Sequence, residues 1–288
     1  MRDFYASSAP MPLDQADGLR RLFAGRCRQV LALAANPHVP FSGAVLDRLA
    51  AVLAGQGRQV LVVDAAGGSP PPQELASVDL AACVETLAPR VNYLPARGLP
   101  MNYVDTRGSA GGFIDAVQQA APQAEIVLLH ADGIDLARMF KHRPARPLLI
   151  GADHPESIKH AYANAKLLVR RCGLMSFDLL LAASPHSPRA QAIATSLAGC
   201  IDNFLGAVLR STALIDPAGD PAAATDAALT QLLAAQLALD EAPGLRPRAP
   251  PDMSPDLSPD TPPDTPPDAP PVRIPTPLKQ RSAPRHAF

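Results

Sequence analysis

The sequence of 288 residues contains no tryptophan, and aromatic residues make up only 4% of it. Its charges nearly cancel to a net charge of −1, so no basic field indicates a nucleic-acid ligand. No apolar run approaches the ~20 residues that a membrane-spanning helix needs, and the N-terminal stretch lacks the apolar segment of a signal peptide. These absences predict a cytoplasmic protein whose contact with a membrane is at most peripheral.

The sequence also lacks the usual signatures of disulfides and metal sites. Its four cysteines lie far apart and form no C-x-x-C pair, which favours reduced cysteines in the core. His154, Glu156 and His160 lie close together in "DHPESIKH", but their spacing is not H-E-x-x-H or any similar metal motif. We therefore expect these three side chains on a solvated surface, and no bound metal.

The middle of the chain alternates short, almost continuously apolar runs with helical stretches, and it is predicted to form one domain over residues 28–242. Strands are predicted at 29–35, 59–65, 91–96, 125–131, 146–152 and 177–183. Helices are predicted at 43–55, 78–87, 111–121, 155–172 and 187–209. Such runs are typical of parallel strands covered on both faces. The pattern predicts an α/β fold, a doubly wound, mostly parallel sheet with helices on both faces.

Two segments of different composition flank this domain. Residues 1–27 form a polar arm with one short amphipathic segment, and residues 243–288 are rich in proline, with Pro-Asp recurring every four residues. Proline lacks the donor for helix or sheet bonds, so a disordered tail that acts as a spacer is favoured over a ligand for a proline-binding domain. The leucines of 226–244 share one helical face without flanking Lys or Arg, which favours packing on the domain over lying on a membrane.

The turn after the first predicted strand reads "ANPHVPFSG" and contains one glycine and no lysine. Phosphate-binding turns are rich in glycine because their backbone N–H groups must curl around the phosphate. Pro37 and Pro40 each remove one N–H donor, and Phe41 adds bulk where a phosphate would sit. Ser42 is predicted to cap the following helix. The turn thus has the position of a phosphate site without the groups that bind phosphate.

The order of strand, turn, helix, "VLVVDAA", a later buried strand and "PESIKHAYANAKLL" resembles the MinD/ParA family of deviant P-loop ATPases. Within this family the sequence is most similar to the flagellar-number regulators of the FlhG/FleN type. The resemblance covers about residues 12–217 and is most specific in "LDQADGLRRLF", "ADHPESIKHAYANAKLLVRR" and "IDNFLGAVLRSTALIDP". It implies a P-loop NTPase-like fold.

Aligned on this family, the turn has lost its nucleotide-binding side chains. Pro37 stands in the place of the signature lysine that reaches the partner's phosphates in the family's ATP-bound dimer. Ser42 stands in the place of the second, phosphate-cradling lysine, and Gly43 in the place of the threonine that holds Mg²⁺. Without the signature lysine, the resemblance implies a monomer.

Two further nucleotide elements differ from the family pattern. Asp64 remains in "VVDAA", but Ala66 replaces the second aspartate, which orients the attacking water in the family. His130 replaces the Walker B aspartate at the end of a buried strand. Phosphoryl transfer depends almost wholly on such positioning groups. We therefore expect no ATP hydrolysis, no catalytic residues and no bound Mg-ATP cofactor.

The N-terminal arm keeps the family motif D-Q-A-x-x-L-R as Asp14, Gln15, Ala16, Leu19 and Arg20. In the flagellar branch this peptide binds the signal-recognition-type (SRP-type) GTPase that places flagella, and it stimulates GTP hydrolysis there. Its apolar stripe beside arginine side chains is typical of a helix that docks in a groove. Folding onto its own domain is the alternative.

These features predict a regulator of flagellar number or placement that does not hydrolyse ATP and presents its N-terminal helix to the SRP-type GTPase. Flagellar basal-body proteins and transcription factors are further candidate partners. One alternative is an active ATPase that switches between monomer and membrane-bound dimer, with Arg28, Arg58 or Lys141 as a substitute cation. Another is a regulator of cellulose synthesis or chromosome partition, since one fold serves several systems.

Overall fold

The computed structural model describes residues 29–184, 187–219 and 227–238. The predicted N-terminal motif at residues 14–20 and the proline-rich tail lie outside these residues. Both predictions therefore stay predictions. Among the described residues, no helix is both long and apolar enough to span a membrane.

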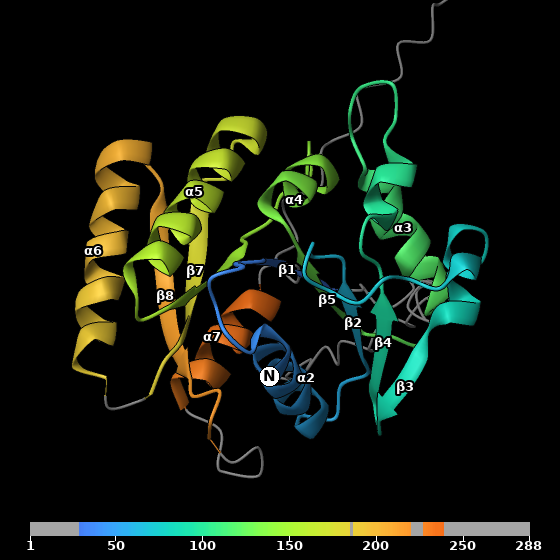
Figure 1. Cartoon of the computed structure of the whole chain (residues 1–288), viewed down its shortest axis with the longest axis horizontal. Helices are drawn as coiled ribbons and strands as arrows, with labels where there is room; N and C mark the ends of the chain where they lie inside the picture. The colour runs from blue at the N-terminus through green and yellow to red at the C-terminus, as the bar shows by residue number, and fades with distance from the viewer. Residues whose placement is uncertain (1–28, 185–186, 220–226, 239–288) are drawn as a thin grey trace, which may run out of the picture. The chain divides into compact units, whose positions relative to one another are not determined.

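One sheet of eight strands forms the centre of the described part, in the order β3-β4-β2-β5-β1-β6-β7-β8 (Figure 1). The strands are β1 (Gln29–Ala34), β2 (Val60–Asp64), β3 (Glu85–Ala88), β4 (Val91–Pro95), β5 (Ile126–Ala131), β6 (Leu148–Ala152), β7 (Ser176–Ala182) and β8 (Val208–Ile215). Every pairing is parallel except that of β3 with β4. The mostly parallel sheet confirms the predicted fold class.

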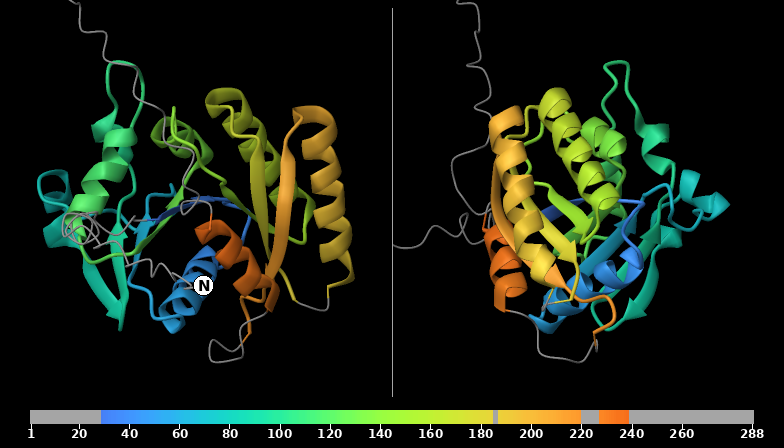
Figure 2. Two further views of the ribbon diagram at one scale, coloured as in Figure 1. Left: turned by 180° about the vertical axis from the view of Figure 1, so that it is seen from behind. Right: turned by 60° about the vertical axis from the view of Figure 1, so that its left-hand side comes forward.

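Helices cover both faces of this sheet, as Figure 2 shows. They are α2 (Ser42–Gly55), α3 (Gly111–Ala120), α4 (Gly133–Met139), α5 (Pro155–Cys172), α6 (Pro188–Leu205) and α7 (Ala227–Leu237). The buried side chains of α2 and α7 belong to one core cluster, and those of α3 to α6 belong to the other. Three 3₁₀ helices, η1 (Glu74–Ser77), η2 (Ala81–Cys83) and η3 (Leu99–Tyr103), lie in the connections.

The side chains of β1 show why its sequence is apolar throughout. Leu31 and Leu33 belong to the cluster under α2 and α7, whereas Ala32 and Ala34 belong to the cluster under α3 to α6. Successive residues of a strand point to opposite faces, so a strand covered on both sides buries every side chain. The pattern therefore predicted this strand correctly.

The predicted helix at 78–87 is wrong, because this stretch contains η2 and most of β3. The carboxylate of Asp79 accepts hydrogen bonds from the backbone N–H groups of Ala81 and Ala82. Side chains of this kind compete with helical hydrogen bonding. The free edge of β4 then pairs with Glu85–Ala88, and this pairing outweighs local helix propensity.

The predicted helix at 187–209 overruns its true end at Leu205. Gly206 follows in the left-handed region with φ of 62°, and its N–H donates to the carbonyl of Asp202. Glycine adopts this conformation without steric cost and commonly ends a helix. Val208 and Leu209 therefore open β8 instead of closing the helix. The short helix α4 was not predicted at all.

The prediction that the leucine-rich segment packs on the domain is confirmed for α7. The side-chain amide of Gln236 donates to the carboxylate of Asp178 at 2.6 Å and to the carbonyl of Arg146 at 3.0 Å. Asp178 is fully buried and also pairs with Arg146 at 2.9 Å, and burial raises the pKa of its carboxyl group in spite of the arginine. Gln29 donates to the last carbonyl of the helix, that of Leu237. The apolar face consists of Leu229, Leu232, Leu233 and Leu237.

Candidate functional site

The candidate site lies at the carboxyl edge of the sheet, where β1 is flanked by β5 on one side and β6 on the other. Connections from these strands leave in opposite directions, and open α/β sheets bind ligands at such a point. The structure brings the predicted residues to this edge after three neighbouring strands. The residues that follow β1 are Pro37, Ser42 and Gly43. Asp64 is the last residue of β2, and Ala66 lies in the loop after it. His130 is the last residue but one of β5.

The turn after β1 is held by the side chain of Asn36, which is only 3% exposed. Its amide nitrogen donates to the carbonyls of Ile150 and Ser157, both at 2.8 Å, and its carbonyl oxygen accepts from the N–H of His38 at 3.1 Å. The N–H of Val39 donates to the backbone carbonyl of Asn36 at 3.0 Å. Two N–H groups of the turn are thus bound within the protein, where a phosphate-binding loop would offer them to its ligand.

Histidines from α5 and its N-cap fasten the same turn. The Nε2 atom of His154 lies 2.7 Å from the carbonyl oxygen of His38. The ring of His38 also meets those of His154 and His160 edge-on, with centroids 6.4 and 5.7 Å apart. His154 and His160 are half-buried at the surface and in contact with the turn, while Glu156 is exposed and pairs with Lys159. In the described ranges, no group of three or more His, Cys, Asp or Glu is arranged to hold a metal.

The start of α2 differs from the predicted cap. Phe41 occupies the N-cap position in the left-handed conformation, with φ of 58°, and its side chain is 76% exposed. Ser42 is the first helical residue, and no side chain caps the helix. The prediction that Ser42 is the cap was wrong. A side chain as exposed as that of Phe41 projects into solvent and does not fill the turn.

A buried, hydrogen-bonded pair of side chains lies between the ends of β2 and β5. The Nδ1 atom of His130 is 2.7 Å from Oδ1 of Asp64, and the two residues are only 3% and 8% exposed. The hydroxyl of Ser69 donates to the same carboxylate oxygen, and the hydroxyl of Tyr93 donates to Oδ2 at 3.5 Å. Both oxygens of Asp64 are therefore engaged by groups of the protein itself.

These contacts determine the charge state of Asp64. Burial alone would raise the pKa of its carboxyl group, but hydrogen bonding and charge interaction with His130, together with the Ser69 bond, lower it below its usual value. Burial and the charge of Asp64 raise the pKa of Tyr93 to about 12. Because the carboxylate only accepts, Nδ1 of His130 carries the proton. The other ring nitrogen, Nε2, is buried without a hydrogen-bond partner in the described part of the chain.

The loop after β2 is also fastened to the protein. The N–H of Ala65 donates to the carbonyl of His130 at 2.8 Å, and the N–H of Gly67 donates to the carboxylate of Asp132 at 3.1 Å. Ala66 is only 5% exposed. The loop position at which the family orients water thus holds a buried methyl group, which has no acid–base chemistry.

The two described candidate cations bind other groups of the protein. Arg58 pairs with Glu125 at 3.6 Å, and both residues precede their strands, so they lie at the opposite, amino edge of the sheet. Lys141 donates to the carbonyl of Arg107. Arg28 lies outside the described residues. Among the described candidates, neither cation is at the turn.

Four site residues were missed by sequence reasoning: Asn36, Ser69, Tyr93 and Asp132. Tyr93 lies opposite Val62 in the register of β2 and β4, which brings its hydroxyl toward the end of β2. Asn36 could have been identified from its position directly after the predicted strand at 29–35. A buried amide at that point needs hydrogen-bond partners from another loop. Its partner Ser157 is 121 residues away, so the sequence could not identify it.

Neither the family models nor the curated proteins contain a match to this sequence. Among solved structures, the fold is similar to that of cobyrinic acid a,c-diamide synthase from Mycobacterium smegmatis with bound ADP and magnesium. The TM-score is 0.52 and the identity 14%, covering 75% of this chain and 96% of that chain. The MinD cell division ATPase of Pyrococcus furiosus (TM-score 0.45, 16% identity, 73% and 99% covered) and a ParA family ATPase of Chlorobium tepidum (0.41, 17%, 75% and 93%) are further neighbours.

At these identities the likeness concerns the fold alone. The structural neighbours include MinD/ParA family P-loop ATPases.

Proposed function

We propose that this protein is a regulator with a MinD/ParA-type fold that does not hydrolyse ATP and that controls flagellar number or placement. It presents its N-terminal helix to the flagellar SRP-type GTPase and acts in the cytoplasm as a monomer, without nucleic acid. The absence of ATP hydrolysis in this proposal rests on the buried pair of Asp64 and His130 at the carboxyl edge of the sheet. The flagellar role rests on the N-terminal motif alone.

The contacts of the site support the loss of Mg-ATP chemistry. A structural neighbour carries ADP and magnesium in its solved structure. In this chain the corresponding edge offers no lysine on the turn, two of the turn's N–H groups are bound to Asn36, and both oxygens of Asp64 are engaged. Phosphoryl transfer needs a metal, a cation and a positioned water, and these changes affect all three. The carboxylate of Asp132, which accepts from the N–H of Gly67, also lies near this edge.

The motif Asp14, Gln15, Ala16, Leu19 and Arg20 supports the partner assignment. Its similarity to the activator peptide of the flagellar branch makes the α/β domain a scaffold that carries this peptide. Basal-body proteins and transcription factors are additional partners in the same proposal. A role in cellulose synthesis or partition would use the same scaffold with a different partner.

Nucleotide binding is tested with the purified full-length protein. A ligand that binds the native state raises the melting temperature in proportion to its concentration over its Kd. We expect no shift with millimolar Mg-ATP compared with ATP in the presence of EDTA, and no phosphate release above a blank. A clear Mg-dependent shift, or turnover that titrates with the protein, would support the ATPase alternative.

Partner activation is tested by measuring GTP hydrolysis of the SRP-type GTPase with the full-length protein. The Gln15→Ala variant and a variant lacking residues 1–27 should lose the stimulation. The Gln56→Ala variant is the matched control, because Gln56 is an exposed glutamine just after α2. Stimulation that survives the deletion contradicts the role of the motif. If the unmodified protein neither binds nor stimulates this GTPase, the flagellar assignment is wrong.

A further inference from the structure

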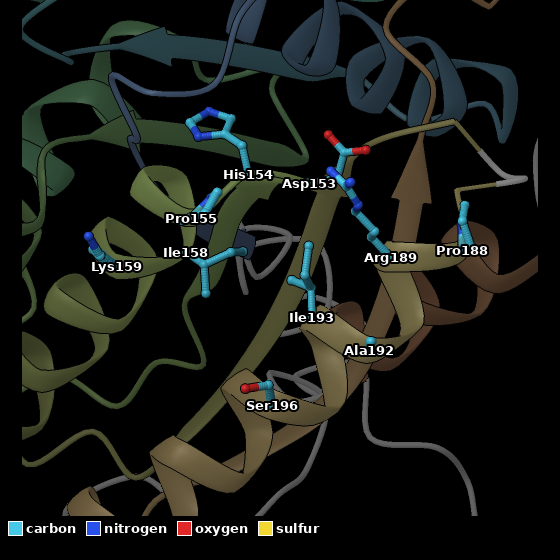
Figure 3. Close-up of a pocket in the computed structure, with 10 residues that line it drawn as sticks. All are labelled: Asp153, His154, Pro155, Ile158, Lys159, Pro188, Arg189, Ala192, Ile193 and Ser196. Atoms are coloured by element: carbon cyan, nitrogen blue, oxygen red, sulfur yellow. The ribbon is translucent and has the colours of Figure 1, made fainter.

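A pocket lies between the N-terminal halves of α5 and α6, on the face of the sheet opposite α2 (Figure 3). Its volume is about 630 Å³. The walls come from the first turns of α5 and the first three turns of α6, and most of the wall side chains are apolar. The apolar ones are Pro155, Ile158, Pro188, Ala192 and Ile193.

These dimensions and this lining are typical of small-molecule sites. Such sites have volumes of roughly 300–1,000 Å³ and apolar walls, with a small number of polar groups that orient the ligand. The pocket lies on the face of the sheet opposite α2, and His154 of its lining borders the turn after β1.

The polar groups of the lining have an excess of positive charge. Lys159 and Arg189 contribute two cations, and Asp153 contributes one carboxylate. Asp153 accepts a hydrogen bond from the hydroxyl of Ser187 at 3.2 Å, and Lys159 is paired with Glu156 at 2.7 Å. Arg189 forms no ion pair within the described part of the chain. Figure 3 shows Arg189 and Asp153 at the same end of the pocket.

The two helices reinforce this preference. Both are 18 residues long and begin at the pocket with a proline in the first turn, so the positive ends of their dipoles face the same opening. The apolar part of a ligand would therefore pack between the two helices, and a negatively charged group of the same ligand would lie at the opening. Neither an uncharged hydrocarbon nor a small inorganic anion would use both parts of the pocket.

We propose that this pocket binds a small amphipathic carboxylate, with its hydrocarbon part against Ile158 and Ile193 and its carboxylate at Arg189. His154 belongs to the lining and also binds the carbonyl of His38, so the occupant contacts a residue that fastens the turn after β1. This proposal goes beyond the function proposed above, because it uses neither the N-terminal motif nor the pair of Asp64 and His130.

The test uses full-length protein with labelled isoleucine methyl groups, titrated with octanoate and, separately, with 1-octanol. A ligand of this size binds weakly, so we expect saturable shifts at millimolar concentrations. The shifts should occur at Ile158 and Ile193 but not at Ile126, which is buried in the sheet. No saturable shift at the two pocket residues would overturn the proposal.

Two pairs of variants separate specific binding from general effects. Ala192→Trp fills the pocket from an exposed position and should weaken octanoate binding at least about tenfold, because a volume occupied by the indole excludes the ligand. Gln191→Trp, at the exposed neighbouring position outside the lining, should leave binding unchanged. Equal affinities in both tryptophan variants would overturn the proposal.

The second pair tests the charge. Arg189→Gln should weaken octanoate binding about 1.5- to 5-fold, as expected for an exposed charge pair, and should leave octanol binding unchanged. Arg170→Gln, in the last turn of α5 and outside the pocket lining, is the control and should have no effect. If Arg189→Gln weakens octanol as much as octanoate, the assignment of the carboxylate to Arg189 is wrong.

Discussion

Removing His130 should destabilise the protein far more than an ordinary substitution, because it leaves the Asp64 carboxylate buried without its main partner. Breaking a buried ion pair by removing one member costs about 3–5 kcal/mol. Asp64 keeps the hydroxyl of Ser69, a bond worth about 1 kcal/mol, and the longer contact with Tyr93 at 3.5 Å. We therefore expect His130→Leu to lower the free energy of unfolding by about 2–4 kcal/mol.

The measurement is urea denaturation followed by circular dichroism at pH 7. Thermal unfolding is a second measurement. For a domain of this size, a loss of 1 kcal/mol in the free energy of unfolding lowers the melting temperature by roughly 2–4 °C, so His130→Leu should melt about 4–16 °C lower. Adding Asp64→Asn to His130→Leu should recover part of this loss, because the double variant no longer buries an unpaired charge. The sign of this coupling distinguishes a buried ion pair from simple packing.

Two results would refute this reasoning. If His130→Leu lowers the free energy of unfolding by less than 1 kcal/mol, the carboxylate is not held mainly by His130. The second result concerns the double variant. If its loss of stability equals the sum of the losses in His130→Leu and Asp64→Asn, the two effects are additive and the side chains do not interact.

Three further substitutions follow from particular contacts. Phe41→Gly should raise the free energy of unfolding by about 0.5–1 kcal/mol, and Gly206→Ala should lower it by about 1 kcal/mol, because both positions are left-handed and only glycine adopts that region freely; urea denaturation checks both, and equal signs would contradict the argument. Gln236→Ala removes a hydrogen bond to the buried Asp178 and should cost about 1.5–3 kcal/mol, with faster proteolysis at α7. The lowered pKa of Asp64 means that its contribution to stability is present above its unfolded pKa of 3.8 and is lost as the pH falls through the folded value. Because of the Asp64 shift, the stability of Asp64→Asn should fall less steeply as the pH is lowered than that of the unmodified protein. The raised pKa of Asp178 has the opposite effect: the stability that this group contributes is lost as the pH rises through its folded pKa.

The six strands between β3 and β8 were predictable because they are covered on both faces, so their apolar runs mark them without knowledge of their neighbours. The edge strand β8, which is partly exposed, was not among the strands predicted from apolar runs. The edge strand β3 was not predictable, because its four residues are all exposed and only pairing with β4 makes them a strand. The positions of Asp64 and His130 were identified separately, as departures from a family pattern. That they meet depends on β5 lying between β2 and β1, a pairing between residues 66 positions apart in the chain. Local patterns carry no information about such a neighbour.

The polar groups at the carboxyl edge of β1, β2 and β5 are bound by one another. A carboxylate that had merely lost its metal would remain as an unpaired buried charge, which is among the most costly states in a protein core. Asp64 instead has a protonated nitrogen and two hydroxyls around it. The N–H groups of His38 and Val39 are bound by Asn36, and the carbonyl of His38 is bound by His154. Each of these contacts stabilises one closed arrangement, so binding Mg-ATP would require breaking several of them at once. Substituting one member of this network should therefore destabilise the fold, as argued for His130.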